Sequence, residues 1–280
     1  MPSQVELIGR HPLAPDIFEK WFASCDIAPS SNKCHRSLIA QKPSNDDQLT
    51  DWLARKIISH HYSPDKLERL KQKYHNIGFP QYAAQHRQIP SADRTRKGNA
   101  TEIILIEYIQ SCQPNRNLFK AYKFRYNPNV DQSMKGDDAL MVDIITDQNG
   151  KEDLKVFLGE AKFRGVPDRK VLEELSSSLG KDKLPISYSF LIDELYRDPA
   201  TEPIAKLFEN FIMVEVKARG NMKYAGLLLS NTGTFNFVER HFACANPDLV
   251  FISAGMERPE DLIAEAFRKA EELINQPDRL

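Results

Sequence analysis

Apolar positions recur along the chain with spacings that change from helical to strand-like and back. Residues 1–96 are polar and loop-rich, but their apolar spacing predicts a helix at 49–58 and a basic helix at 64–74, and it allows a strand at 81–89. We expect this N-terminal region to pack as an elaboration on the core that follows it.

The chain becomes more apolar after Gly98. Residues 101–110 (TEIILIEYIQ) predict a mainly buried helix, which Asn99 or Thr101 could cap. Three strands are expected next. The Asn-Gly pair at 149–150 predicts a hairpin turn between the last two, because both residues tolerate positive φ. The expected strands are 118–126, 138–147 and 154–163.

Helices and strands then follow one another to the end of the sequence. The expected helices are 168–179, 185–196, 203–211 and 259–274, and the expected strands are 223–230 and 248–253. A helix, a three-stranded meander, a helical segment and further strands predict a mixed α/β (α+β) fold with a central mixed sheet flanked by helices. We place a boundary between an N-terminal region, residues 1–96, and a core domain, residues 97–280.

Composition narrows the class of protein. Hydrophobic residues make up 41% of the chain and charged residues 28%, an ordinary balance for a soluble domain. The four cysteines are widely spaced and form no CxxC pair, which fits a reducing compartment. The N-terminus has no apolar signal segment, and no apolar run is long enough to span a membrane. We expect a cytoplasmic protein without a membrane partner.

The formal net charge of −1 argues against a protein that coats polyanions, but a local basic surface would be enough to bind DNA. Two groups of basic residues are candidates: Arg94, Arg96 and Lys97, and then Lys120, Lys123 and Arg125. The second group is interleaved with aromatic residues. An edge strand with its basic side chains facing solvent explains that group more simply.

Candidate chemistry lies at the ends of the two strands of the predicted hairpin. Glu160 and Lys162 are two positions apart, so their side chains share one face of a strand. The preceding strand opens with Asp137 and Asp138. Carboxylates supply the hard oxygen ligands that Mg²⁺ or Mn²⁺ prefers, and a lysine beside them can stabilise the charge that grows on a scissile phosphate. These residues predict metal-dependent hydrolysis of a phosphodiester.

The hairpin register decides between the two aspartates. A turn centred on Gly150 sets residue 138 opposite 162, whereas a strict two-residue turn sets 137 opposite 162. Asp138 shares its face with the apolar side chains of its strand, and Glu160 with those of the next strand. Both packed faces must lie on one side of the sheet. This favours Asp138 as the metal ligand, with the Asp137 side chain facing solvent at the start of the strand. The choice between the two aspartates stays open.

A second Glu-x-Lys tripeptide, Glu215-Val216-Lys217, follows another apolar run. It has no Asn-Gly hairpin leading back to an acidic strand end. We interpret this copy as a solvated strand terminus and assign the chemistry to the first copy.

The pattern of these residues resembles the PD-(D/E)xK nuclease superfamily. Its core is a helix, a three-stranded meander, a helix and a further strand, with a metal-binding Asp on the second strand and Glu-x-Lys on the third. The match covers residues 96–253. It implies a restriction-endonuclease-like core, with Asp138, Glu160 and Lys162 as catalytic residues and Glu102, Asp138 and Glu160 as ligands of Mg²⁺ or Mn²⁺. A first-turn acid favoured by the helix dipole is the alternative interpretation of Glu102.

More particularly, the Lys97-Gly98 pair before Glu102, Gly136-x-Asp138 and the run LGEAKFR at 158–164 are similar to the nuclease subunits of the Hachiman anti-phage defence system, the HamA family, and to the related abortive-infection protein AbpA. The resemblance implies a Mg²⁺-dependent deoxyribonuclease that attacks DNA during phage infection beside a superfamily 2 helicase subunit (HamB-like).

Two other functions compete with this interpretation. One is a non-catalytic nuclease-fold module that docks onto a helicase and restrains it, which the complete Asp-Glu-Lys set disfavours. The other is a stand-alone restriction-type endonuclease. Nothing in the sequence resembles a base-reading module, and this disfavours the second alternative.

Overall fold

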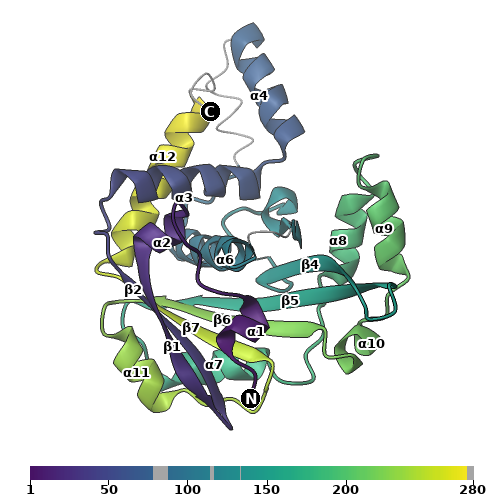
Figure 1. The fold of residues 1–280 in the computed structure, drawn as a ribbon. Coiled ribbons are helices and arrows are strands. Elements are labelled where there is room, and N and C mark those ends of the chain that lie inside the picture. The colour runs from purple at the N-terminus through teal and green to yellow at the C-terminus, as the bar shows by residue number, and fades with distance from the viewer. Residues whose placement is uncertain (78–87, 114–116, 133, 276–280) are drawn as a thin grey trace.

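The computed structural model describes residues 1–77, 88–113, 117–132 and 134–275. Within these ranges a seven-stranded sheet crosses the molecule, with helices on both faces (Figure 1). Its strands are β1 (Phe22–Ser30), β2 (Lys33–Ala40), β3 (Phe119–Lys120), β4 (Ala139–Thr146), β5 (Glu152–Phe163), β6 (Met222–Ser230) and β7 (Leu249–Gly255). The spatial order is β1-β2-β7-β6-β5-β4-β3. The pairs β1–β2, β3–β4 and β4–β5 are antiparallel and the others parallel, which confirms the predicted mixed sheet.

Two apolar cores lie on opposite faces of this sheet. The helices of the first core are α1 (Gln4–Ile8), α2 (Ile17–Trp21), α3 (Asp47–His61), α6 (Asp93–Ser111) and α12 (Pro259–Asn275). The helices of the second core are α7 (Arg169–Ser178), α8 (Tyr188–Leu195), α9 (Glu202–Glu209), α10 (Met213–Ala218) and α11 (Thr234–His241). A further helix, α4 (Pro64–Ile77), extends away from the sheet in Figure 1. No helix in the described ranges is long and apolar enough to cross a membrane.

The later strands and the predicted helices other than 101–110 are confirmed to within a few residues, but several other predictions were wrong. Residues 215–217 lie in the helix α10 and not at a strand end. The segment 81–89, predicted as a possible strand, falls largely outside the described residues.

The strands β1 and β2 have no counterpart in the sequence-based prediction. The buried positions of β2 are largely polar, since His35, Arg36 and Ser37 are all inaccessible to solvent. Arg36 binds Asp26 on β1, with 2.5 Å between Nε and Oδ1, so its charge is compensated inside the fold. A search for alternating apolar residues cannot find a strand that buries charged side chains.

The segment 118–126 was predicted as one strand, and this was wrong. Only Phe119–Lys120 pairs with β4, and the chain then forms the 3-10 helix η1 (Lys123–Tyr126). The basic side chains of this segment turn inward to carboxylates and do not face solvent, so an edge strand with an exposed basic face does not form.

The helix α6 begins about two turns earlier than predicted, at Asp93. Asn99 and Thr101 therefore lie inside the helix and cap nothing. The Asn99 amide lies 3.0 Å from the His61 ring, and the Thr101 hydroxyl donates to the preceding turn. The start of α6 is capped from another segment, because Asp131 accepts the N–H of the residue before the helix.

Candidate active site

The β4–β5 hairpin brings Asp138 beside Glu160. The pairing runs from Ala139↔Gly159 to Thr146↔Glu152, so neither turn proposed from the sequence forms and the loop spans residues 147–151. One further step of this register sets 138 opposite 160. The predicted register was therefore wrong by two residues, but a shift of two leaves each side chain on its expected face.

Gly159 explains why α6 lies close to the end of this hairpin. A Cβ atom built on Gly159 would lie 2.7 Å from Cδ2 of Leu105 and 2.9 Å from Cβ of Ala139, so only glycine fits between the helix and the sheet. Glu102 precedes Leu105 by about one helical turn. It is thereby held near the strand ends, in the third turn of α6, where the dipole explanation for a first-turn acid does not apply.

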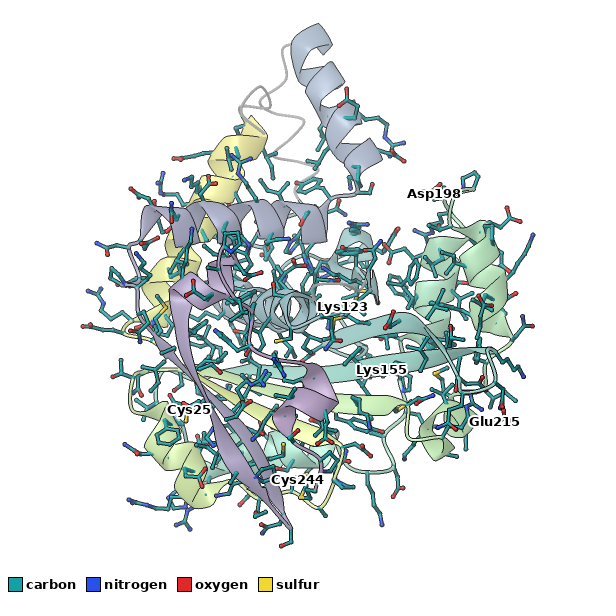
Figure 2. The ribbon with its side chains drawn as sticks, in the orientation of Figure 1. Cys25, Lys123, Lys155, Asp198, Glu215 and Cys244 are labelled. Atoms are coloured by element: carbon teal, nitrogen blue, oxygen red, sulfur yellow. The ribbon has the colours of Figure 1, made fainter. Side chains whose placement is uncertain are left out.

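Lys123 binds two of the three predicted carboxylates. Its ammonium lies 2.7 Å from Oε2 of Glu102 and 3.4 Å from Oδ1 of Asp138, and it donates to the backbone oxygen of Asp137 at 3.1 Å. The side chain comes from η1, between α6 and the β4–β5 pair (Figure 2). Lys123 was expected on a solvent-facing surface, and this was wrong. The excess of predicted carboxylates over cations at this site was the one signal that a buried cation was needed.

Electrostatic interactions tie these groups together. Burial, together with the charges of Asp138 and Glu160, raises the pKa of Glu102 to about 8 against the opposing charge of Lys123. Burial alone would lower the pKa of Lys123, but the charges of Glu102 and Asp138 outweigh it and raise that pKa. Lys123 therefore stays charged, and the carboxylates lie close enough to repel one another.

Glu160 and Lys162 form the second part of the cluster. Oε1 of Glu160 lies 2.5 Å from Nζ of Lys162, and both side chains are partly exposed at the end of β5. Burial and the charge of Asp138 raise the pKa of Glu160 despite this partner. The Lys162 ammonium is thus the cation of the cluster that solvent reaches most easily, with 29% of its side chain exposed against 8% for Lys123.

Asp137 faces a different part of the fold. Its side chain is buried, accepts the N–H of Ser187 at 2.8 Å at the start of α8, and lies 3.4 Å from Nζ of Lys183. Asp137 was expected to face solvent at the start of the strand, and this was wrong. The Asp137 side chain thereby connects the start of α8, in the second core, to the end of the hairpin.

The three predicted ligands suit a hard divalent cation by their chemistry, since all are carboxylates and an ammonium already binds two of them. Within the described part of the chain, however, no group of three or more His, Cys, Asp or Glu side chains converges as a finished metal site. Lys123 lies between Glu102 and Asp138, and Glu160 is turned toward Lys162. The residues fit the ion, but side chains must rearrange to hold it.

The basic residues proposed for DNA binding are mostly engaged within the fold. Lys120 pairs with Glu107 at 2.8 Å, and Arg125 pairs with Glu194 at 3.3 Å. Arg96 binds Glu271 at the C-terminal helix, at 2.6 Å. Arg94 is exposed, and Lys97 pairs with the largely exposed Asp93 while its ammonium lies 5.5 Å from the ring centre of Phe163. These last two form the part of the predicted surface that solvent reaches.

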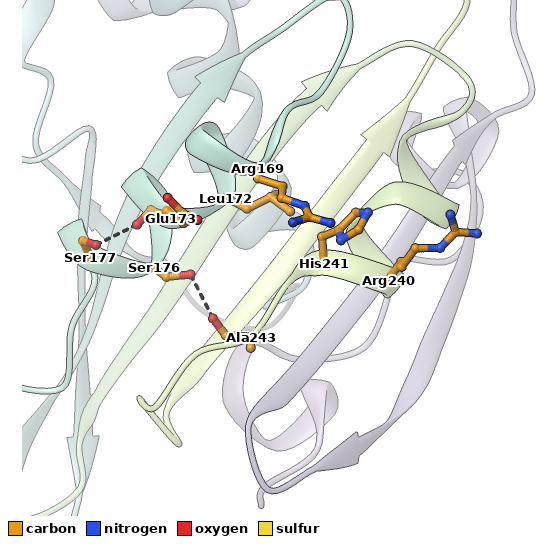
Figure 3. Close-up of a pocket in the computed structure, with 8 residues that line it drawn as sticks. All are labelled: Arg169, Leu172, Glu173, Ser176, Ser177, Arg240, His241 and Ala243. Carbon is orange, nitrogen blue, oxygen red and sulfur yellow. Dashed lines mark hydrogen bonds between the residues drawn. The ribbon is translucent and has the colours of Figure 1, made fainter.

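An open groove of about 510 Å³ lies elsewhere, between α7 and α11 (Figure 3). Its lining residues are Arg169, Leu172, Glu173, Ser176, Ser177, Arg240, His241 and Ala243. The Ser176 hydroxyl donates to the backbone oxygen of Ala243, which joins α7 to the segment after α11, and the Ser177 hydroxyl donates to that of Glu173 within α7. Its lining includes no predicted catalytic residue, so we assign no chemistry to it.

A mixed sheet with carboxylates and lysines gathered at the end of one antiparallel strand pair defines an α/β protein of nuclease-like fold. A family model described as HamA matches residues 15–270. The protein of Bacillus cereus named Hachiman protein HamA is 36% identical over 277 residues, which cover 97% of this chain and 96% of that protein. The chain belongs to the HamA family, which confirms the resemblance to that family drawn from the sequence.

Proposed function

We propose that this chain is a metal-dependent deoxyribonuclease of the PD-(D/E)xK type that acts in Hachiman anti-phage defence. The observation that carries the proposal is the meeting of Glu102, Asp138, Glu160 and Lys162 from one helix and two strands at one end of the hairpin. Membership of the HamA family supports the defence role, and by the resemblance a superfamily 2 helicase is the proposed partner.

Each residue has a role that its position allows. Glu102, Asp138 and Glu160 would hold Mg²⁺ or Mn²⁺, which supplies positive charge beside the scissile phosphate and acidifies a water molecule. Lys162 is the more exposed cation of the cluster, and its ammonium is placed to stabilise the negative charge that develops on a phosphate oxygen. Glu160 orients that ammonium through their 2.5 Å contact.

The test is cleavage of DNA by the purified chain with Mg²⁺ or Mn²⁺ and with excess EDTA. We expect cleavage with either ion and none with EDTA, because the ligands are all hard oxygens. Glu160→Ala and Lys162→Ala should abolish cleavage while the far-ultraviolet circular dichroism and the melting temperature stay close to those of the parent. Full cleavage in EDTA would refute the metal-dependent mechanism.

The second Glu-x-Lys copy provides a matched control. Glu215 and Lys217 lie on α10. Glu215 is largely exposed and lies well apart from Lys123 in Figure 2. Glu215→Ala with Lys217→Ala should leave cleavage largely unchanged. If this pair abolished cleavage and the Glu160 and Lys162 variants did not, the site would be assigned to the wrong element.

A non-catalytic module that docks onto and restrains a helicase is the second candidate function. The position of Lys123 between Glu102 and Asp138 favours it, because an internal ammonium already compensates those carboxylates. Absence of cleavage by the free chain with both Mg²⁺ and Mn²⁺, together with binding to the helicase, would select this function.

A further inference from the structure

Three oxygen atoms lie around the ammonium group of Lys123. It donates hydrogen bonds to the backbone oxygen of Asp137 at 3.1 Å and to Oδ1 of Asp138 at 3.4 Å, and Oε2 of Glu102 lies 2.7 Å away as an ion-pair partner. Only 8% of the side chain is exposed. An all-oxygen shell of carboxylates and a carbonyl is also the kind of environment that binds a hard metal ion.

The backbone that carries Lys123 is held firmly. Phe124 is buried and stacks on His61, with 4.9 Å between ring centres and 14° between planes. The Arg125 guanidinium donates to the backbone oxygen of Ser59 at 2.9 Å. The side chain of Lys123 is flexible by nature, so it can leave the carboxylates by rotation about its own bonds while η1 stays in place.

We propose that Lys123 is a built-in counter-ion that positions Glu102 and Asp138 and competes with a divalent cation for their oxygens. The inference rests on the proposed function in that the same two carboxylates hold the metal. Lys123 then sets the Mg²⁺ concentration at which the site fills. Its ammonium must move away from the two carboxylates before they can take another cation.

The competition predicts opposite effects of Lys123 with and without metal. Without metal, Lys123→Met removes the ammonium that the partly buried Glu102 and Asp138 share, so the melting temperature should fall. When Mg²⁺ is present, the variant has no Lys123 ammonium to compete with the ion. Mg²⁺ should therefore stabilise the variant at a concentration about tenfold lower than the parent needs. A tenfold ratio corresponds to the loss of about 1.4 kcal/mol of competing interaction.

The experiment is thermal unfolding of the full chain in EDTA and across a MgCl₂ titration, without DNA. The matched control is Lys120→Met, which removes a neighbouring, partly buried lysine that pairs with Glu107 in a separate cluster. Lys120→Met should lower the melting temperature in EDTA but respond to Mg²⁺ as the parent does. A Mg²⁺ response of Lys123→Met that is equal to or weaker than the parent's would overturn the proposal.

A second variant covers the case in which Lys123→Met does not fold in EDTA. The double variant Glu102→Gln with Lys123→Met removes one of the two acids together with the ammonium that they share, so in EDTA at a pH above 8, where Glu102 with its pKa of about 8 is ionised in the parent, it should fold and melt above the single variant. A double variant no more stable than the single one would also refute the counter-ion role. DNA cleavage is not measured here, so failure of the nuclease assignment would leave this Mg²⁺ response unchanged.

Discussion

Oδ2 of Asp138 accepts a hydrogen bond from the backbone N–H of Ala161, with 3.0 Å between the atoms. The residue that precedes β4 is thereby tied to the middle of the Glu-Ala-Lys tripeptide on β5. The other oxygen of the same carboxylate lies 3.4 Å from Lys123. One side chain thus fixes the hairpin end with one oxygen and belongs to the charged cluster with the other.

This division of roles separates the two neighbouring aspartates. Asp138→Asn keeps an oxygen for the Ala161 N–H but loses the charge, so we expect DNA cleavage to fall on the order of 100-fold or more with little loss of stability. Asp137→Asn weakens a buried contact with Ser187 and should cost about 1–3 kcal/mol of unfolding free energy. Urea denaturation and cleavage rates per folded molecule check both. Loss of cleavage confined to Asp137→Asn would contradict the assignment.

Gly159 gives a prediction about the support of the site. Gly159→Ala forces a methyl group against Leu105 and Ala139, so the unfolding free energy should fall by about 1–3 kcal/mol. Because the same shift moves α6 away from the hairpin, cleavage should fall as well. Gly98→Ala is the control, since an added Cβ there meets nothing within 4 Å inside α6. It should raise stability by about 0.5–1 kcal/mol. Chemical denaturation of both variants measures the difference.

The buried His61 predicts a loss of stability in acid. Its Nδ1 donates to the Ile57 carbonyl at 2.7 Å and its Nε2 accepts from Asn99, so the folded state requires the neutral ring. Burial lowers the pKa of His61 to about 3, whereas the unfolded chain titrates near the usual 6.5. The unfolded state therefore binds more protons between pH 6.5 and 3. The stabilisation present above pH 6.5 is lost as pH falls through this window, by up to about 1.4 kcal/mol per pH unit.

Urea denaturation at pH 7 and pH 5 checks this prediction. His61→Gln can still donate to Ile57 and accept from Asn99, so its stability should change less between the two pH values than that of the parent. His241 on α11 is less buried than His61, so His241→Gln should reduce the acid dependence less than His61→Gln does. An equally steep acid dependence in His61→Gln would assign the effect to other groups.

Lys97 is the lysine of the predicted basic surface that remains accessible, and it lies near Phe163, the residue after Lys162. Lys97→Ala should weaken DNA binding in EDTA regardless of sequence and reduce the salt dependence of log K by about one. Lys206→Ala is the control, because Lys206 is also an exposed lysine paired along its own helix. Fluorescence anisotropy across a salt series gives both slopes. Equal slopes for the two variants would remove Lys97 from the DNA contact.

The part of the fold that sequence could predict is the part whose buried positions are apolar. The runs in β5, β6 and β7 and the helix α12 satisfy this condition, and so their positions were predicted closely. β2 buries His35 and Arg36, so the apolar pattern predicted no strand there. The segment after β3 buries Lys123, and there the pattern predicted a strand that is too long.

The candidate site shows the same limit. Glu160 and Lys162 could be paired from their spacing alone, because side-chain alternation in a strand is a local property. The partnership of Lys123 with Glu102 joins residues 21 positions apart on two elements, 102 and 123. No local pattern encodes that contact, and the loop of residues 147–151, longer than an Asn-Gly turn requires, shifted the register as well.

The pairing of β2 with β7 has a consequence for solubility. Every residue of β7 is buried, and the strand contains neither a charge nor a proline. If residues 1–96 were removed, the backbone groups of β7 that pair with β2 would form an open, apolar border, the kind of template on which a second chain adds a strand. A fragment of residues 97–280 should therefore self-associate into β-rich aggregates, so the N-terminal strands act as a covering that keeps the molecule from polymerising.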